Sequence, residues 1–322
     1  MPRKFIVSVL LLASCRAPSP TFAVQAAEQR SFALPPAYPC ARYSPVTQTG
    51  RVQAEGLREL SGMTASRQHK GVFWAHNDAG HKPKLWAIDS QGRLLAEYKL
   101  KHQANIDWED IASGPCPLSV ATASVNCLYL ADTGDNSGSR PLSSILRWPE
   151  PLQLAQASTV TVKVDEQDLD AFDFTYPDGP HNIESLAVLP DGRCLLLTKD
   201  NGAASQLFRV TLSQPHNNQV ESMGHLPVLG AIGKQAAVTA ADLTADGHWL
   251  IVRTRSAVWL MDATDLSLTQ GQLGDRLGRL RPFALPDAPD AHGEAVAWDS
   301  SGDYWLISEG LLPSIWQGHC VR

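Results

Sequence analysis

Five short segments of this chain align with one another, and four of them begin with Ser or Glu beside a short apolar run. They are 61-SGMTAS-66, 109-EDIASG-114, 184-ESLAVL-189, 241-ADLTAD-246 and 294-EAVAWD-299. Most are followed by a turn and further apolar runs, and the segments recur at a period near 50 residues, which is typical of β-propeller blades of about four strands each. No long helical pattern interrupts them. The repeat therefore predicts an all-β fold, a five-bladed β-propeller with four-stranded blades around a central channel.

One step of the repeat is longer than the others. Glu109 and Glu184 are 75 residues apart (184 minus 109). Two runs between them, 159-TVTVKV-164 and 172-FDFTY-176, read as strands. A sixth blade within 143–180 is therefore the alternative, but five blades are preferred because this stretch has no copy of the acid-plus-apolar start.

The last repeat ends after about three strands, at Cys320. Closing the ring would remove exposed sheet edges. We therefore expect the missing strand of the last blade to come from the N-terminal region around 42–57. A disulfide between Cys40 and Cys320 would lock that closure.

The N-terminus reads as a secretory signal and not as part of the fold. A basic start, MPRK, precedes an apolar run over 5–13 that is too short to span a bilayer. The stretch that ends at Cys15 resembles a bacterial lipobox, in which this cysteine is lipidated, whereas 23-AVQAA-27 offers an ordinary cleavage site. We expect a protein of the periplasm or an outer-membrane lipoprotein that meets the membrane only through its lipid. The expected segments are a signal and leader over 1–26, a linker over 27–41 and one propeller domain over 42–322.

Export makes the other cysteines candidates for disulfides. Cys116 and Cys127 flank a short polar segment and are expected to pair. Cys194 lies in the apolar run 194-CLLLT-198, so we expect a buried free thiol.

The geometry of a propeller predicts where the repeated acids lie. The first strand of each blade lines the channel, so the residues that open the five segments meet near the axis. This ring is expected to consist of Ser61, Glu109, Glu184, Ala241 and Glu294. Three carboxylates in a narrow channel repel one another unless protons, water or a cation separate them. Oxygen ligands favour a hard cation, so Ser61 and the three glutamates predict a Ca²⁺ site, with Mg²⁺ or Mn²⁺ as alternatives.

The run 59-ELSGMT-64 resembles the opening of the soluble calcium-activated nucleotidase (apyrase) family, and 109-EDIA, 128-LYLAD and 293-GEAVA extend the resemblance. The same outline is similar to the bacterial phytase-like (esterase-like) and SdiA-regulated propellers. The nucleotidase resemblance implies five blades and an axial calcium held at positions that run Ser, Glu, Glu, Ser, Glu, with Ala241 replacing the second Ser. The chain departs from that family where phosphate-clamping residues are expected. It has 76-HNDAG-80 in place of an acid-Arg-Thr-Gly loop and 197-LTKD-200 in place of paired arginines, which weakens the nucleotidase interpretation more than the calcium site.

Polar residues crowd the loops that follow the second strand of each blade, and these loops should surround the mouth of the acid ring. Three of them are candidate catalytic groups: Asp78, Asp132 and Arg253. Seven are candidate substrate-binding groups: His76, Asn77, Asn136, Arg140, Lys199, Arg255 and Glu309. The alternative for Asp132, Asp135 and Asn136 is a role in forming turns.

Composition narrows the function only by exclusion. With a formal net charge of −6, the chain has no excess of basic residues that would point to a nucleic-acid polymer. No P-loop, serine-hydrolase elbow or zinc-protease motif is present. We therefore expect a monomeric exported propeller that binds an anionic small molecule or an envelope component. A metal-dependent hydrolase of an anionic ester, phosphoester or nucleotide is the main alternative, and a glycan-active propeller is a third.

Overall fold

The computed structural model describes residues 38–117, 126–155, 161–200, 204–227, 229, 233–269, 274–290 and 292–322. The predicted signal and leader over 1–26, Cys15, and the predicted linker as far as residue 37 lie outside these ranges. Helical structure in the described part is limited to 3-10 turns in the connections, and none of it is long and apolar enough to cross a membrane. These turns are η1 (Glu166–Asp168), η2 (Lys234–Ala236), η3 (Thr264–Ser267) and η4 (Gly274–Arg279).

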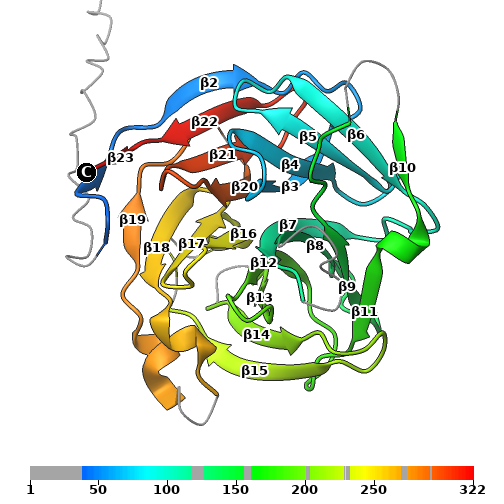
Figure 1. Ribbon diagram of the computed structural model, residues 1–322. Helices are drawn as coiled ribbons and strands as arrows, with labels where there is room; N and C mark the ends of the chain where they lie inside the picture. Colours follow the sequence, from blue (N-terminus) through cyan, green and yellow to red (C-terminus); the bar gives the residue numbers. More distant parts are fainter. Residues whose placement is uncertain are drawn as a thin grey trace, which may run out of the picture. The chain divides into compact units, whose positions relative to one another are not determined.

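Five sheets surround a common centre and form a five-bladed β-propeller, as predicted (Figure 1). Blade 1 contains β3 (Leu60–Ala65), β4 (Val72–Asn77), β5 (Lys84–Asp89) and β6 (Leu94–Leu100). Blade 2 contains β7 (Trp108–Pro115), β8 (Asn126–Asp132), β9 (Ser143–Pro149) and β11 (Asp170–Phe174). Blade 3 contains β12 (Ile183–Val188), β13 (Cys194–Thr198), β14 (Gln206–Thr211) and β15 (Gln219–His225). Blade 4 contains β16 (Val238–Leu243), β17 (Trp249–Thr254), β18 (Ala257–Asp262) and β19 (Phe283–Leu285). Blade 5 contains β20 (Gly293–Trp298), β21 (Tyr304–Ser308), β22 (Ser314–Gly318) and β2 (Thr47–Arg51).

The long step of the repeat does not contain a sixth blade, so that alternative is wrong. Strands β9 and β11 are the outer strands of blade 2. Strand β10 (Val162–Val164) instead pairs in parallel with β6 and adds a fifth strand to blade 1. Of the two predicted runs, Val162–Val164 and Phe172–Phe174 are therefore in strands, which belong to two existing sheets, and residues 159–160 lie outside the described ranges.

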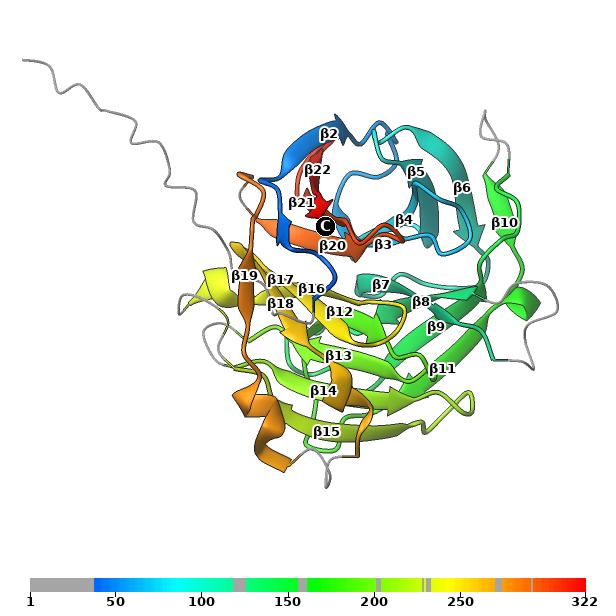
Figure 2. The same cartoon turned by 60° about the vertical axis from the view of Figure 1, so that its left-hand side comes forward.

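The ring is closed by an N-terminal strand, as the sequence predicted. Strand β2 is the outer strand of blade 5, antiparallel to β22, and both views show these two strands side by side (Figures 1 and 2). A short pair, β1 (Arg42–Tyr43) with β23 (Cys320–Val321), adjoins the closure. The disulfide between Cys40 and Cys320 is present, with their Cα atoms 5.4 Å apart. Blade 5 therefore has four strands, three from the C-terminal part of the chain and one, β2, from the N-terminal part.

The other cysteine predictions are also confirmed. Cys116 and Cys127 form a disulfide, and Cys194 is a buried free thiol. Two disulfides are consistent with an exported protein, because such bonds persist in oxidising compartments.

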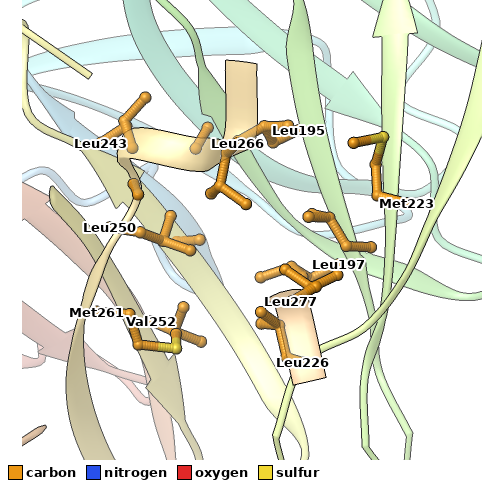
Figure 3. Close-up of a cluster of buried hydrophobic side chains, with 14 of the residues drawn as sticks. Leu195, Leu197, Met223, Leu226, Leu243, Leu250, Val252, Met261, Leu266 and Leu277 are labelled. Carbon is orange, nitrogen blue, oxygen red and sulfur yellow. The ribbon is translucent and has the colours of Figure 1, made fainter. Parts of the chain in front are cut away.

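The core consists mainly of contacts between neighbouring blades. Figure 3 shows one such layer, in which Leu195 and Leu197 of blade 3 face Leu250 and Val252 of blade 4. Leu277 of η4 covers its outer end. Each blade alternates side chains between its two faces, so every sheet buries both faces against its neighbours.

Two buried aspartates join the innermost strands of different blades. Asp110 on β7 accepts main-chain hydrogen bonds from Leu186 on β12 (2.8 Å) and Ala241 on β16 (3.3 Å), as well as from Ile111. Asp242 on β16 accepts them from its neighbour Leu243 and from Trp298 on β20 (2.8 Å each). These carboxylates stabilise the inner wall of the channel, because each one holds strands that belong to separate sheets.

Candidate metal centre

A polar cavity of about 230 Å³ opens where the innermost strands begin. It is lined by Glu59, Leu60, Ser61, Asp78, Glu109, Asn136, Glu184, Lys199, Arg255, Glu294 and Glu309. Nine of these side chains belong to the residues predicted from the sequence as metal, catalytic or substrate-binding groups. The structure therefore brings most of the predicted site to one end of the channel.

A β-bulge at the start of every innermost strand explains how the ring forms. The pairing with the second strand of the blade skips Ser61 and Gly62 in β3, Glu109 in β7, Glu184 in β12, Thr239 in β16 and Glu294 in β20. A bulge inserts an extra residue and re-aims side chains at this point of the strand. The same bulge in all five blades places one polar side chain per blade at an equivalent position.

The register corrects one member of the predicted ring. Ala241 pairs with Val252 in the regular part of β16 and does not occupy the bulge. Thr239 occupies it, two residues earlier, and its hydroxyl is buried without a hydrogen-bond partner in the described part of the chain. By register, the equivalent bulge positions are therefore Ser61, Glu109, Glu184, Thr239 and Glu294, and the first, second, third and fifth of these line the cavity.

The three ring glutamates are buried but differ in their partners. Glu184 pairs with Lys199 and accepts a hydrogen bond from Asn182 (3.2 Å). The carboxylates of Glu109 and Glu294, which are only 4% and 9% exposed, have no hydrogen-bond or ion-pair partner among the described residues. Ser61 donates its hydroxyl to the main-chain carbonyl of Glu109 (2.7 Å).

Burial and mutual repulsion make ionisation of this ring unfavourable without a cation. Burial, followed by the charge of Glu184, raises the pKa of Glu294 to about 8. Burial raises the pKa of Glu109 well above its usual range, and Glu184 and Asp78 add to the effect. The pKa of Glu184 is also raised by burial, although Lys199 counteracts this. A cation placed among these groups would favour their ionised forms.

A tighter acidic group lies to one side of the ring. Carboxylate oxygens of Asp78, Asp107 and Glu109 all lie within 4.8 Å of one another. Asp107 precedes β7, and Asp78 follows β4. Burial, followed by the charge of Asp78, raises the pKa of Asp107. Asp107 was missed as a site residue in the sequence, as was Glu59, although Asp107 lies only two residues before Glu109.

Two residues predicted to bind substrate, His76 and Asn77, instead stabilise the strand and the turn next to the cavity. His76 is fully buried, and a Cβ atom on Gly62 would lie 2.4 Å from its Nε2. The imidazole of His76 therefore packs directly against the backbone of β3. Burial lowers the pKa of His76 to about 4, which keeps the imidazole neutral. Asn77 accepts hydrogen bonds from the main chain of Arg58 and Glu59 and donates one to Gly56, and thereby fixes that turn.

Three more predicted residues are engaged with other protein groups. Asp132 and Arg140 form an ion pair with each other (2.6 Å), and Asp132 also accepts a hydrogen bond from the main chain of Asp107. Arg253 is not in a mouth loop but within β17, with none of its surface exposed. It donates to the carbonyls of Ala295 and Ile307 in blade 5 (2.8 and 2.7 Å). The structure does not bring Arg253 to the mouth, because its guanidinium holds blade 4 against blade 5.

A larger cavity, of about 510 Å³, opens at the other end of the innermost strands. Its acids Asp242, Asp246 and Asp299 all accept main-chain hydrogen bonds from their own turns or strands. This cavity therefore lacks the unpaired carboxylates that distinguish the 230 Å³ site.

Comparison with known proteins identifies no family. No family model matches the chain, and no curated protein matches it. Among solved structures, an aldose sugar dehydrogenase from Streptomyces coelicolor in its PQQ-bound form is 13% identical, with a TM-score of 0.46 over 88% of this chain and 99% of the other. A protein assigned as a gluconolactonase is 10% identical, with a TM-score of 0.42 over 86% and 94%. A glucose dehydrogenase is 9% identical, with a TM-score of 0.41 over 85% and 99%. At such low identities and TM-scores, these likenesses say nothing about the chemistry of this chain.

Proposed function

We propose that this chain is an exported propeller that binds a Ca²⁺-type cation at the mouth of its channel and uses it to hold a ligand in the cavity. The five equivalent bulges carry the proposal. They supply two hydroxyls and three carboxylates from five blades, and two of those carboxylates have no other partner. A site made only of oxygen ligands suits Ca²⁺, with Mg²⁺ or Mn²⁺ as alternatives.

The corrected ring also supports the nucleotidase-like interpretation of the cation site. With Thr239 in the fourth position, the order is Ser, Glu, Glu, Thr, Glu. It differs from the pattern of that family only in having Thr in place of the second Ser. The phosphate-clamping arginines of the family are still absent from the corresponding loops. The proposed likeness therefore concerns the cation and not the nucleotide.

The ligand proposed for the cavity is an anionic small molecule or an anionic group of an envelope component. Arg255 lines the cavity, and its guanidinium has no hydrogen-bond or ion-pair partner in the described chain. Lys199 is occupied by Glu184. An anionic group would thus meet Arg255 and the bound cation together, an arrangement that favours carboxylate, sulfate or phosphate.

One observation favours hydrolysis of an anionic ester as a second candidate function. Asp78 lines the cavity beside Asp107, so two carboxylates are placed to accept a proton from a water molecule there. A divalent cation, when bound, would polarise the ester oxygen. Of the three predicted catalytic residues, only Asp78 remains a candidate, because Asp132 and Arg253 are engaged elsewhere.

Thermal unfolding with and without cation tests the proposed site. At a Ca²⁺ concentration a hundredfold above Kd, the melting temperature should exceed its value in EDTA by about 5–10 °C, since binding to the folded state adds about 2.7 kcal/mol. Glu184→Gln should lower both Ca²⁺ affinity and this gain, whereas Glu166→Gln on η1 should change neither. Melting that is insensitive to chelator in the wild-type protein would refute the cation site.

A substrate panel separates binding from catalysis. Release of nitrophenol from p-nitrophenyl phosphate that requires Ca²⁺ and is lost in Asp78→Asn would establish the hydrolase. Cation-dependent melting without any turnover on phosphate and carboxylate esters would leave the binding function.

A further inference from the structure

The charge of the cavity exceeds what one cation can balance. Six lining side chains are carboxylates, whereas only Lys199 and Arg255 are cations. Asp107, next to the lining group, adds a seventh carboxylate. A single divalent ion would leave an excess of negative charge in a partly buried site, which opposes the entry of any anionic ligand.

The excess is concentrated at the acidic group of Asp78, Asp107 and Glu109. Their carboxylate oxygens lie within 4.8 Å of one another, and the neighbouring cations are committed elsewhere. Arg140 binds Asp132 and the carbonyls of Gly134 and Leu142. Among the described residues, the only hydrogen bond to these three carboxylates is the one that Asp78 accepts from the adjacent main chain of Ala79.

An independent observation on Glu109 points to a ligand. Its side chain is only 4% exposed, lines the cavity, and has no donor in the described residues. The backbone of Gly134 lies directly against it, since a Cβ atom at Gly134 would come within 2.1 Å of Glu109 Oε1 and 2.4 Å of Asp107 Oδ2. The two carboxylates therefore both pack against the backbone of Gly134. A buried carboxylate without donors either keeps a proton or is paired with a counter-charge, and a cation bound between Glu109 and Asp107 would supply that charge.

We propose that the mouth holds two divalent cations, one in the bulge ring and one bound by Asp78 and Asp107, with Glu109 shared between them. This inference deepens the proposed function and rests on it. Glu109 is suited to bridge the ions because it belongs to both groups. Two cations bring the charge of the cavity close to neutral, and a pair of cations clamps the two oxygens of a phosphate or carboxylate group. The ligand class is accordingly a phosphoryl or carboxylate compound held by both ions.

Calcium stoichiometry of the full-length metal-free protein tests the pair. Isothermal titration should give two Ca²⁺ ions for the wild-type chain and one for Asp107→Asn. The matched variant Glu294→Gln should still bind the ion held by Asp78 and Asp107, and its affinity for the ion in the bulge ring should fall at least tenfold. The near-UV circular dichroism spectra of both variants in EDTA should match that of the wild type, which confirms that each variant is folded. Asp78→Asn is a second variant that removes the site formed by Asp78 and Asp107.

Titration with Mn²⁺ gives an independent readout. The wild-type protein loaded with two equivalents should show the electron paramagnetic resonance spectrum of a magnetically coupled pair, and Asp107→Asn should show an isolated ion. A wild-type stoichiometry of one that Asp107→Asn leaves unchanged would overturn the second site and leave the ring site standing. A single ion lost equally in both variants would overturn the pair as well. No binding by the wild-type protein would overturn the proposed function together with this inference.

Discussion

Glu109 and Asp110 are neighbours in β7, and both are buried, but they belong to two different regions of the channel. Asp110, like Asp242, lies in the wall and accepts two or three main-chain hydrogen bonds. Glu109, like Glu294, lies at the mouth and accepts none in the described structure. Burial raises the pKa values in both regions, so the pKa direction does not separate them. The two regions differ in the number of hydrogen-bond donors to each carboxylate. The wall carboxylates have donors and hold strands together, whereas Glu109 and Glu294 at the mouth have none among the described residues and are available to bind a ligand.

The largest expected effect comes from removing a wall carboxylate. Asp110→Ala should lower the free energy of unfolding by roughly 3–5 kcal/mol, because it leaves buried N–H groups of three residues without acceptors. Urea unfolding in EDTA measures this loss. Calcium stoichiometry of the folded fraction should stay unchanged, and a loss below about 1 kcal/mol would remove the distinction between wall and mouth.

The carboxylates at the mouth should make the stability of the metal-free protein depend on pH. The pKa of Glu294 is about 8 in the folded state against an ordinary 4.5, so the folded protein binds more protons between these values. Stability in EDTA should therefore fall as pH rises from about 5 to 8, by an amount on the order of a few kcal/mol. Urea unfolding at several pH values checks this.

Two controls sharpen that experiment. Glu294→Gln should reduce the slope of the profile, because it removes one of the carboxylates whose pKa is raised in the folded state. Saturating Ca²⁺ should weaken the dependence, because the ion favours the ionised carboxylate. A flat profile for the wild-type protein in EDTA would contradict the pKa direction assigned to the mouth.

Lys199 is a cation already present in the mouth, and its removal should have a smaller effect. Its ammonium pairs with Glu184 and also lowers the pKa of Glu109 and Glu294. Lys199→Met should raise Ca²⁺ affinity up to about tenfold, which is about 1.4 kcal/mol, because the ion no longer competes with a positive charge. Calorimetric titration measures it, and an unchanged affinity would mean that Lys199 lies outside the field of the bound ion.

The smallest expected effect tests the fourth ring position. Thr239→Val keeps the shape but removes a hydroxyl that is buried without a partner. Ca²⁺ affinity should fall a few-fold, roughly 1 kcal/mol or less, while stability in EDTA stays the same or rises slightly. Ala241→Ser, at the position expected from the sequence, should not change the affinity. The reverse result would restore Ala241 to the ring.

The sequence was sufficient for the architecture because each blade repeats its strand pattern and turns. Period, blade number, the closing strand from 42–57 and the Cys40–Cys320 bond all follow from where the repeats start and stop. Three ring glutamates could be found in the same way, because each one immediately precedes an apolar run.

Residues whose placement depends on register or on partners could not be found. A bulge leaves no compositional mark, so the fourth repeat was aligned on Ala241, two residues after the bulge at Thr239. Arg253 looks like a mouth residue in the string RTRS, yet it ends up inside a strand while Arg255 reaches the cavity. Asp132 and Arg140 each suggest chemistry alone, but in space they neutralise each other.

The closing strand β2 has a consequence for how this protein is made. It is the first long strand to be synthesised, and its partner β22 is nearly the last. The nascent chain therefore carries an unpaired strand until β22 has been synthesised. The ring cannot close before then, and a folding helper that shields β2 in the interval would act on the yield of folded protein more than on its final stability.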